Sequence, residues 1–206
     1  MSHRAPVDAP SARSAARAAP PLLFRPLTPS RWPDLVRLFG PRGASGGCWC
    51  MYWRRKRSEY VRGKGAGNRA AFRKIVRAGE LPGLLAYDGR RPVAWCAIAP
   101  RGAYPGLANS RILRPVDERQ VWSISCFYVQ RDYRRAGVTV PLLRAAVDHV
   151  KQRGGCVVEG YPIDPGPSPF PSAFAWTGLA SAFRKAGFKE VARRSATRPI
   201  MRIRIA

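Results

Sequence analysis

Two arginines and a glycine lie in a turn that could hold phosphate groups. The turn, residues 129–139 (Val-Gln-Arg-Asp-Tyr-Arg-Arg-Ala-Gly-Val-Thr), follows an apolar run over residues 121–129 that predicts a strand. A helix is predicted after it, because Leu142, Leu143 and Ala146 recur at helical spacing. The first turn of a helix has unpaired N–H groups and the positive end of the helix dipole. With Arg134 and Arg135 beside these groups, the turn predicts a pyrophosphate site.

Acid–base chemistry has one main carboxylate candidate. Glu159 lies within the apolar run Cys-Val-Val-Glu-Gly-Tyr, where burial would raise its pKa and make it a general base. The alternative is a strand carboxylate held in a salt bridge. Asp164 is a second candidate base in a loop, whereas His149, late on the predicted helix, is expected at the surface. Tyr128 and Tyr161 could donate a proton to a leaving group, or be packed aromatic residues.

The five cysteines are expected to be reduced thiols, since their number is odd and no secretion signal precedes them. Cys48 and Cys50 form a Cys-x-Cys pair without a second pair or a nearby His, so no metal site is predicted. Cys126 could be a nucleophile, but no His is placed to activate it and core packing is preferred. The chain therefore offers no obvious thiol or metal chemistry.

The elements that position these residues follow from periodicity and turn residues. Helices are predicted to begin at the caps Ser30, Asn68 and Thr177 and to end at glycines 40, 79 and 187. A hairpin is predicted over residues 83–87 and 93–99, and strands over residues 24–27, 121–129, 156–161, 188–194 and 200–205. A proline-rich segment, residues 162–171, reads as a stiff loop over a pocket. The predicted fold class is α/β (α+β).

Length and charge limit the possible classes of protein. The 206 residues allow one domain over residues 21–206, after a basic tail at residues 1–20 whose composition predicts disorder. No stretch of about 20 apolar residues occurs, so a membrane span is excluded and a cytoplasmic protein is expected. The net charge is +25, and basic residues cluster over residues 54–77. That cluster is either a solvated helical face or a surface for RNA or an acidic ligand.

The phosphate turn resembles the acyl-coenzyme A loop of the GNAT N-acetyltransferase superfamily, whose pattern is Arg/Gln-x-x-Gly-x-Gly/Ala. Arg134 and Gly137 match the pattern, whereas Thr139 replaces its second small residue and Arg131 replaces a usual proline. The segment Phe-Arg-Lys-Ala-Gly-Phe at residues 183–188 is similar to a second family motif. The run Cys-Trp-Cys-Met-Tyr-Trp at residues 48–53 resembles one in a bacterial subgroup of undefined substrate. The order of elements over residues 22–205 also matches the family.

The resemblance implies a central, splayed mixed sheet flanked by helices, and direct transfer of an acetyl group from acetyl-coenzyme A to an amine. Pantetheine would pair with free strand amides, so that the implied coenzyme-binding residues are Phe127, Tyr128, Val129, Arg134, Arg135, Ala136, Gly137, Val138, Thr139 and Phe183. The family often has a tyrosine acid where Phe183 stands, so Tyr128, Tyr161 or water would replace it. Acceptor binding is implied for Trp49, Tyr52 and Trp53, which could instead be core residues.

Three functions stay open from the sequence. The first is acetylation of a small-molecule amine of unknown identity. The second is acylation of a macromolecular amine, on a protein or an aminoacyl-tRNA, that uses the basic cluster. The third is a catalytically silent module that holds an acidic partner, nucleic acid or protein. The sequence does not predict the oligomeric state.

Overall fold

A computed structural model gives the fold for residues 21–166 and 172–206. The tail predicted at residues 1–20 lies outside the described residues, and so does the end of the proline-rich loop, residues 167–171. None of the helices in the described part is long and apolar enough to cross a membrane.

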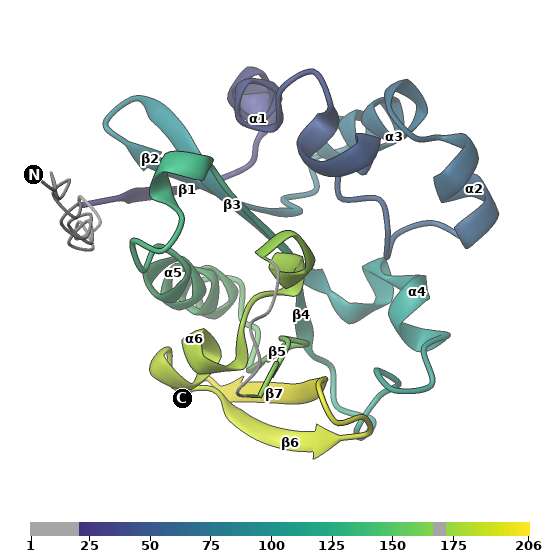
Figure 1. The fold of residues 1–206 in the computed structure, drawn as a ribbon, viewed down its shortest axis with the longest axis vertical. Coiled ribbons are helices and arrows are strands. Elements are labelled where there is room, and N and C mark those ends of the chain that lie inside the picture. The colour runs from purple at the N-terminus through teal and green to yellow at the C-terminus, as the bar shows by residue number, and fades with distance from the viewer. Residues whose placement is uncertain (1–20, 167–171) are drawn as a thin grey trace, which may run out of the picture.

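One mixed sheet of seven strands forms the centre of the molecule (Figure 1). Its strands run in the order β1-β2-β3-β4-β5-β7-β6, and only β4 and β5 pair in parallel. Their bounds are β1 Leu23–Pro26, β2 Gly83–Asp88, β3 Arg91–Pro100, β4 Trp122–Val129, β5 Val157–Gly160, β6 Lys189–Arg193 and β7 Pro199–Arg204. The predicted mixed sheet is confirmed.

Helices cover both faces of this sheet (Figure 1). Alternate strand residues point to opposite faces. Leu84 and Cys96 therefore pack with α5 (Thr139–Lys151) and α6 (Ala180–Lys185), whereas Leu85 and Trp95 pack with α1 (Trp32–Phe39) and α3 (Ala66–Arg77). Two short helices were not predicted: α2 (Arg57–Arg62) and α4 (Pro105–Ala108).

Strands β4 and β5 separate halfway along β4. They pair only from Trp122 to Ile124, and the register of β3 against β4 shifts at the next residue, so that Ala97 faces Cys126 while Ile98 faces Ile124. Ser125 is thus the extra residue of a β-bulge, which bends the strand. Beyond it, residues 125–129 of β4 have no strand partner on the β5 side, which is the predicted splay.

The three predicted helix caps are wrong, because other contacts occupy those side chains. Ser30 lies in a 3₁₀ turn before α1 and bonds to Thr28. Asn68 is inside α3, fully buried, and its amide donates to the carbonyls of Gly47 (3.3 Å) and Tyr60 (3.2 Å). Thr177 precedes α6 in a 3₁₀ turn, and its hydroxyl accepts a bond from Arg198.

His149 is buried rather than at the surface as expected. It is 5% exposed, packs edge-on against Trp122, and accepts a hydrogen bond from Arg153 Nε. Burial, with the nearby charge of Arg153, lowers its pKa to about 4. The side chain lies on the core face of α5 and is not part of the site described next.

Candidate active site

A cleft of about 1040 Å³ opens where β4 and β5 separate. One wall is the half of β4 that does not pair with β5, residues 125–129, and the loop that follows it to the start of α5. The opposite wall comes from segment 44–60, α6 and the residues around Trp176. The splay therefore supplies the space, and three distant segments of the chain line it, within residues 44–60, 125–140 and 165–185.

The turn from residue 134 to residue 139 is shaped to hold an anion. Arg135 and Gly137 adopt left-handed backbone conformations, with φ of 63° and 76°. Within the described residues, the backbone N–H groups of residues 135–139 have no hydrogen-bond partner. These five consecutive donors lead into the N-terminus of α5. Such an arrangement binds the oxygens of a phosphate group.

Side chains fix this turn to the sheet. The Arg134 Nε donates to the carbonyl of Val129 at 3.0 Å, and the Tyr133 hydroxyl donates to Asp88 at 2.5 Å. Arg135 and Lys185 add positive charge to the lining at the same end of the cleft. Coulombic attraction to a pyrophosphate would thus reinforce the backbone donors.

Coenzyme A fits the residues present at this end of the cleft. A side-chain carbon placed on Gly137 would meet no protein atom within 4 Å, so the space beside it is open. Phe127, Tyr128 and Val129 line the cleft on the half of β4 that lacks a strand partner. Their amides can pair with pantetheine as a missing strand would. Ala136 lies in the same turn without lining the cleft.

Aromatic rings form the other end of the cleft. Tyr52 lies at its centre, with ring centroids 4.8 Å from Trp53, 5.4 Å from Tyr60 and 5.3 Å from Trp176. All four residues line the cleft. Tyr52 and Trp53 were predicted to bind an acceptor, whereas Tyr60 and Trp176 were not, because they belong to segments with no motif.

Trp49 needs a correction, since it does not line the cleft. Its ring is 3% exposed and packs against Trp32 at 5.9 Å and Phe39 at 5.6 Å, in the core under α1. The backbone at Trp49 and Cys50 has positive φ, 43° and 55°, which directs neighbouring side chains to different sides. The core alternative for Trp49 is therefore the one that the structure supports.

Three thiols border the aromatic end: Cys48, Cys50 and Cys126. Trp95 Nε1 donates to the Cys50 sulfur at 3.0 Å. Contact with Cys126 and burial raise the pKa of Cys50 well above its usual value, and burial raises the pKa of Cys48. Cys48 and Cys50 are therefore neutral at pH 7 and not activated nucleophiles. Among the described residues, no group of three His, Cys, Asp or Glu side chains could bind a metal.

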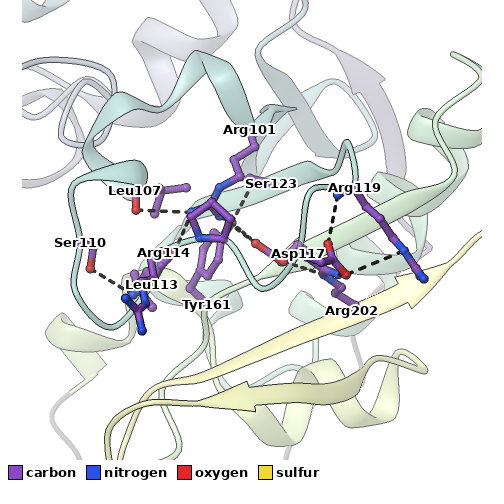
Figure 2. Close-up of polar contacts among 12 residues, drawn as sticks. Arg101, Leu107, Ser110, Leu113, Arg114, Asp117, Arg119, Ser123, Tyr161 and Arg202 are labelled. Atoms are coloured by element: carbon purple, nitrogen blue, oxygen red, sulfur yellow. Dashed lines mark hydrogen bonds and ion pairs between the residues drawn. The ribbon is translucent and has the colours of Figure 1, made fainter.

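Glu159 is fully buried, and its neighbours Arg101, Tyr161 and Arg202 belong to a network of polar contacts (Figure 2). Its carboxylate accepts bonds from Arg101 Nη1 at 2.8 Å and Arg202 Nε at 2.6 Å, and Tyr161 donates to it at 2.5 Å. Arg202 also pairs with Asp117. Glu159 does not line the cleft. Because both oxygens are occupied by cations, this geometry favours the salt-bridge alternative, and its role as a base stays a prediction.

Tyr161 and Phe183 also lie behind the cleft wall. Tyr161 is 1% exposed and its hydroxyl bonds to Ser123 at 2.8 Å as well as to Glu159. Phe183 has no exposed surface and packs edge-on against Phe127 and Phe188. Neither side chain reaches the lining, so of the predicted acids only Tyr128 does.

Asp164, the second candidate base, is likewise occupied. Arg184 and Arg193 both donate to one of its oxygens at 2.8 Å. Their hydrogen bonds hold the pKa of this carboxyl below its usual value. Asp164 does not line the cleft either.

Comparison with known proteins identifies the family. The model of the acetyltransferase (GNAT) family matches residues 48–160, more than half of the chain. The chain belongs to the GNAT acetyltransferase family. The matched region contains the splayed strand, the phosphate turn and the aromatic segment. A comparison with curated proteins gives no match.

Solved GNAT structures share the fold at low sequence identity. A chain of the NatC complex bound to Gag peptide and CoA aligns with a TM-score of 0.54 and 11% identity, over 90% of this chain and 99% of that one. A putative GNAT acetyltransferase from Desulfovibrio desulfuricans gives 0.51 and 15%, over 90% and 100%. The PaiA N-acetyltransferase from Thermoplasma acidophilum, in complex with coenzyme A, gives 0.50 and 15%, over 90% and 99%. These likenesses show the fold.

A second hollow, the basic groove, lies between α1 and α3. It measures about 1010 Å³, and its charged lining residues are all cationic: Arg37, Arg69, Arg73, Lys74 and Arg77. Within the described residues, only Arg37 of these five has an ion-pair partner, Asp34. The basic groove contains part of the cluster noted in the sequence and is separate from the cleft.

Proposed function

We propose that the protein transfers an acetyl group from acetyl-coenzyme A to an amine. The observation that carries this proposal is the run of five unpaired N–H groups, residues 135–139, at the mouth of a cleft along an unpaired half-strand. An acyl-coenzyme A needs both: donors for its pyrophosphate and strand amides for its pantetheine. Acetyl as the acyl group is inferred from the family.

The chain's own groups suggest how transfer would proceed. Acetyl-coenzyme A supplies an activated thioester. Amides beyond the bulge at Ser125 would hold the pantetheine and polarise the acyl carbonyl. Tyr128 lines the cleft and its hydroxyl has no hydrogen-bond partner among the described residues, so we assign it proton donation to the leaving thiolate. Tyr161, as a further proton donor, and Glu159, as the base, would act from buried positions behind the cleft wall.

The bounds of the domain, the class of acceptor and the cellular compartment are part of the same proposal. We take residues 21–206 as the acetyltransferase domain and a small-molecule amine as the acceptor. The five cysteines are all free thiols, which fits the reducing cytoplasm.

The basic groove supports a second candidate, in which the acceptor amine is on a macromolecule. Arginines exposed in a row on α3 suit a phosphate backbone or an acidic protein. A silent binding module would use the same surface. Nucleic acid that stays with the protein through purification, detected at 260 nm, would favour these two candidates.

Release of coenzyme A thiol separates enzyme from module. The full chain would be mixed with acetyl-coenzyme A and a pool of small amines, and acetylated products identified by mass spectrometry. We expect thiol release that depends on the pool, and one acetyl group added to at least one amine. Binding of acetyl-coenzyme A without release in any pool, peptides and aminoacyl-tRNA included, would contradict the enzyme proposal.

A further inference from the structure

We infer that the acceptor is an aromatic amine, with its amino group on the ring and uncharged at neutral pH. This inference rests on the proposed function and names its substrate class. It comes from the aromatic end of the cleft, where the walls, the charges and the ionisable groups point to the same chemistry.

The walls suit a flat ring. Tyr52, Trp53, Tyr60 and Trp176 line the end of the cleft that adjoins the bulged half of β4. Trp53 and Trp176 rings lie 6.0 Å apart at 37°, and the pairs with Tyr52 are edge-to-face. Aromatic side chains prefer such offset and edge-on contacts with further rings. A ligand ring here would extend the cluster.

The charges disfavour an ammonium group. No described residue that lines the cleft is an acid or a histidine. Residues 167–171, Pro-Ser-Pro-Phe-Pro, contain no ionisable side chain in the sequence. The Arg57 guanidinium lies 5.8 Å from the ring centre of Tyr52 and 5.9 Å from that of Tyr60. Cations without a facing carboxylate repel a protonated amine and tolerate a neutral one.

Among the described residues, this end has no carboxylate or imidazole in its lining that could take a proton from an ammonium. The ionisable residues that line it are Cys48, Cys50, Tyr52, Tyr60, Cys126 and Tyr128. Arg57 lies against the rings of Tyr52 and Tyr60, and the charges of Arg54 and Arg198 act on Cys50 and Tyr52. Burial raises the pKa of Tyr60, and the pKa values of the Cys48 and Cys50 thiols are also raised. Glu59, on α2, is exposed and does not line the cleft. Cys48, Cys50 and Tyr60 therefore keep their protons at pH 7, and no carboxylate or imidazole of the described residues lines this end.

An acceptor must then arrive with its lone pair free. An alkylamine with a pKa like that of lysine, about 10.4, is neutral in only about one molecule in 2,500 at pH 7. In an aromatic amine the lone pair is shared with the ring, so the nitrogen is unprotonated at pH 7. Its nitrogen attacks the thioester carbonyl, the C–N bond forms as the C–S bond breaks, and the proton lost by nitrogen passes to the thiolate. The products are an N-aryl acetamide and coenzyme A thiol.

The test compares amines that share a ring. The full chain with acetyl-coenzyme A would be assayed with 4-methoxyaniline, 4-methoxybenzylamine and a tetrapeptide with a free N-terminus. We expect kcat/KM for 4-methoxyaniline to exceed that for the benzylamine at least about a hundredfold at pH 7. We also expect it to stay flat from pH 6 to 9, while any benzylamine rate rises about tenfold per pH unit.

A matched pair of variants locates the subsite. Trp176→Leu should raise the KM for 4-methoxyaniline about tenfold with little change in kcat, because one ring contact is lost. Trp122→Leu, a tryptophan that does not line the cleft, should leave KM unchanged. Thermal unfolding of both variants controls for folding.

The outcomes separate this inference from the proposed function. Faster acetylation of the benzylamine or the peptide would overturn the inference and keep the acetyltransferase. Coenzyme A binding with no acetylation of 4-methoxyaniline would also overturn the inference, whereas absence of coenzyme A binding would overturn both. An equal KM in Trp176→Leu and wild type would contradict the proposed aromatic subsite.

Discussion

Replacement of Glu159 by glutamine decides whether this carboxylate is a structural ion pair or a base. The substitution keeps the shape and removes the charge that Arg101 and Arg202 share at 2.8 and 2.6 Å. These arginine side chains are 14% and 8% exposed, so their charges lose most of their compensation. Breaking a buried pair costs about 3 to 5 kcal/mol. Arg202 keeps Asp117, so we expect about 3 kcal/mol.

Urea unfolding followed by circular dichroism measures this loss. In thermal unfolding of a chain of this size, a loss of about 3 kcal/mol lowers the Tm by about 6 to 12 °C. Glu190→Gln is the matched control, because its partner Arg193 is on the surface and keeps Asp164, so its unfolding midpoint should match wild type. If Glu159→Gln unfolds with the wild-type midpoint but loses about 10² to 10⁴ in turnover, the structural reasoning is refuted and Glu159 is the base.

Two further substitutions test the turn and the core. Thr139→Gly should tighten coenzyme A binding in calorimetry, because a branched side chain crowds the phosphate, although glycine in the helix costs about 1 kcal/mol of stability; weaker binding in a folded variant would show that the hydroxyl is a phosphate ligand. His149 has its pKa lowered from 6.5 to about 4, so the unfolded chain takes up a proton first as pH falls. The stability that neutral His149 contributes is complete above pH 6.5 and lost toward pH 4, by about 2 kcal/mol between pH 7 and 5 in urea unfolding. His149→Gln should remove that part of the pH dependence, and an unchanged dependence would contradict the assignment.

The phosphate turn was predictable because its information is local. Strand, turn and helix follow one another within residues 121–151, and the glycine and arginines that shape the anion site lie between them. The strands could be predicted for a similar reason, since each strand and hairpin has its own pattern, whereas their mixed sheet was implied by the family resemblance. The short helix α2 could not, because Tyr60 is its only buried residue and no apolar stripe marks it.

The acceptor end depends on contacts between distant segments. Trp176 meets Tyr52 across more than 120 residues, and only the fold brings them together. Trp49 and Tyr52 are three residues apart, yet one is in the core and the other in the cleft because the backbone turns through positive φ between them. Burial of Glu159 was predicted from its apolar neighbours, but its two arginine partners, 58 and 43 residues away, were not.

Calorimetric titration of coenzyme A into two glycine variants tests the central claim most directly. Gly137 and Gly154 both have positive φ, 76° and 71°, and open space where a side chain would go, so aspartate strains each backbone alike. Only Gly137 lines the cleft. We expect Gly137→Asp to abolish binding and Gly154→Asp to bind as wild type does, with affinity that falls as salt rises. Equal affinity in the two variants would contradict it.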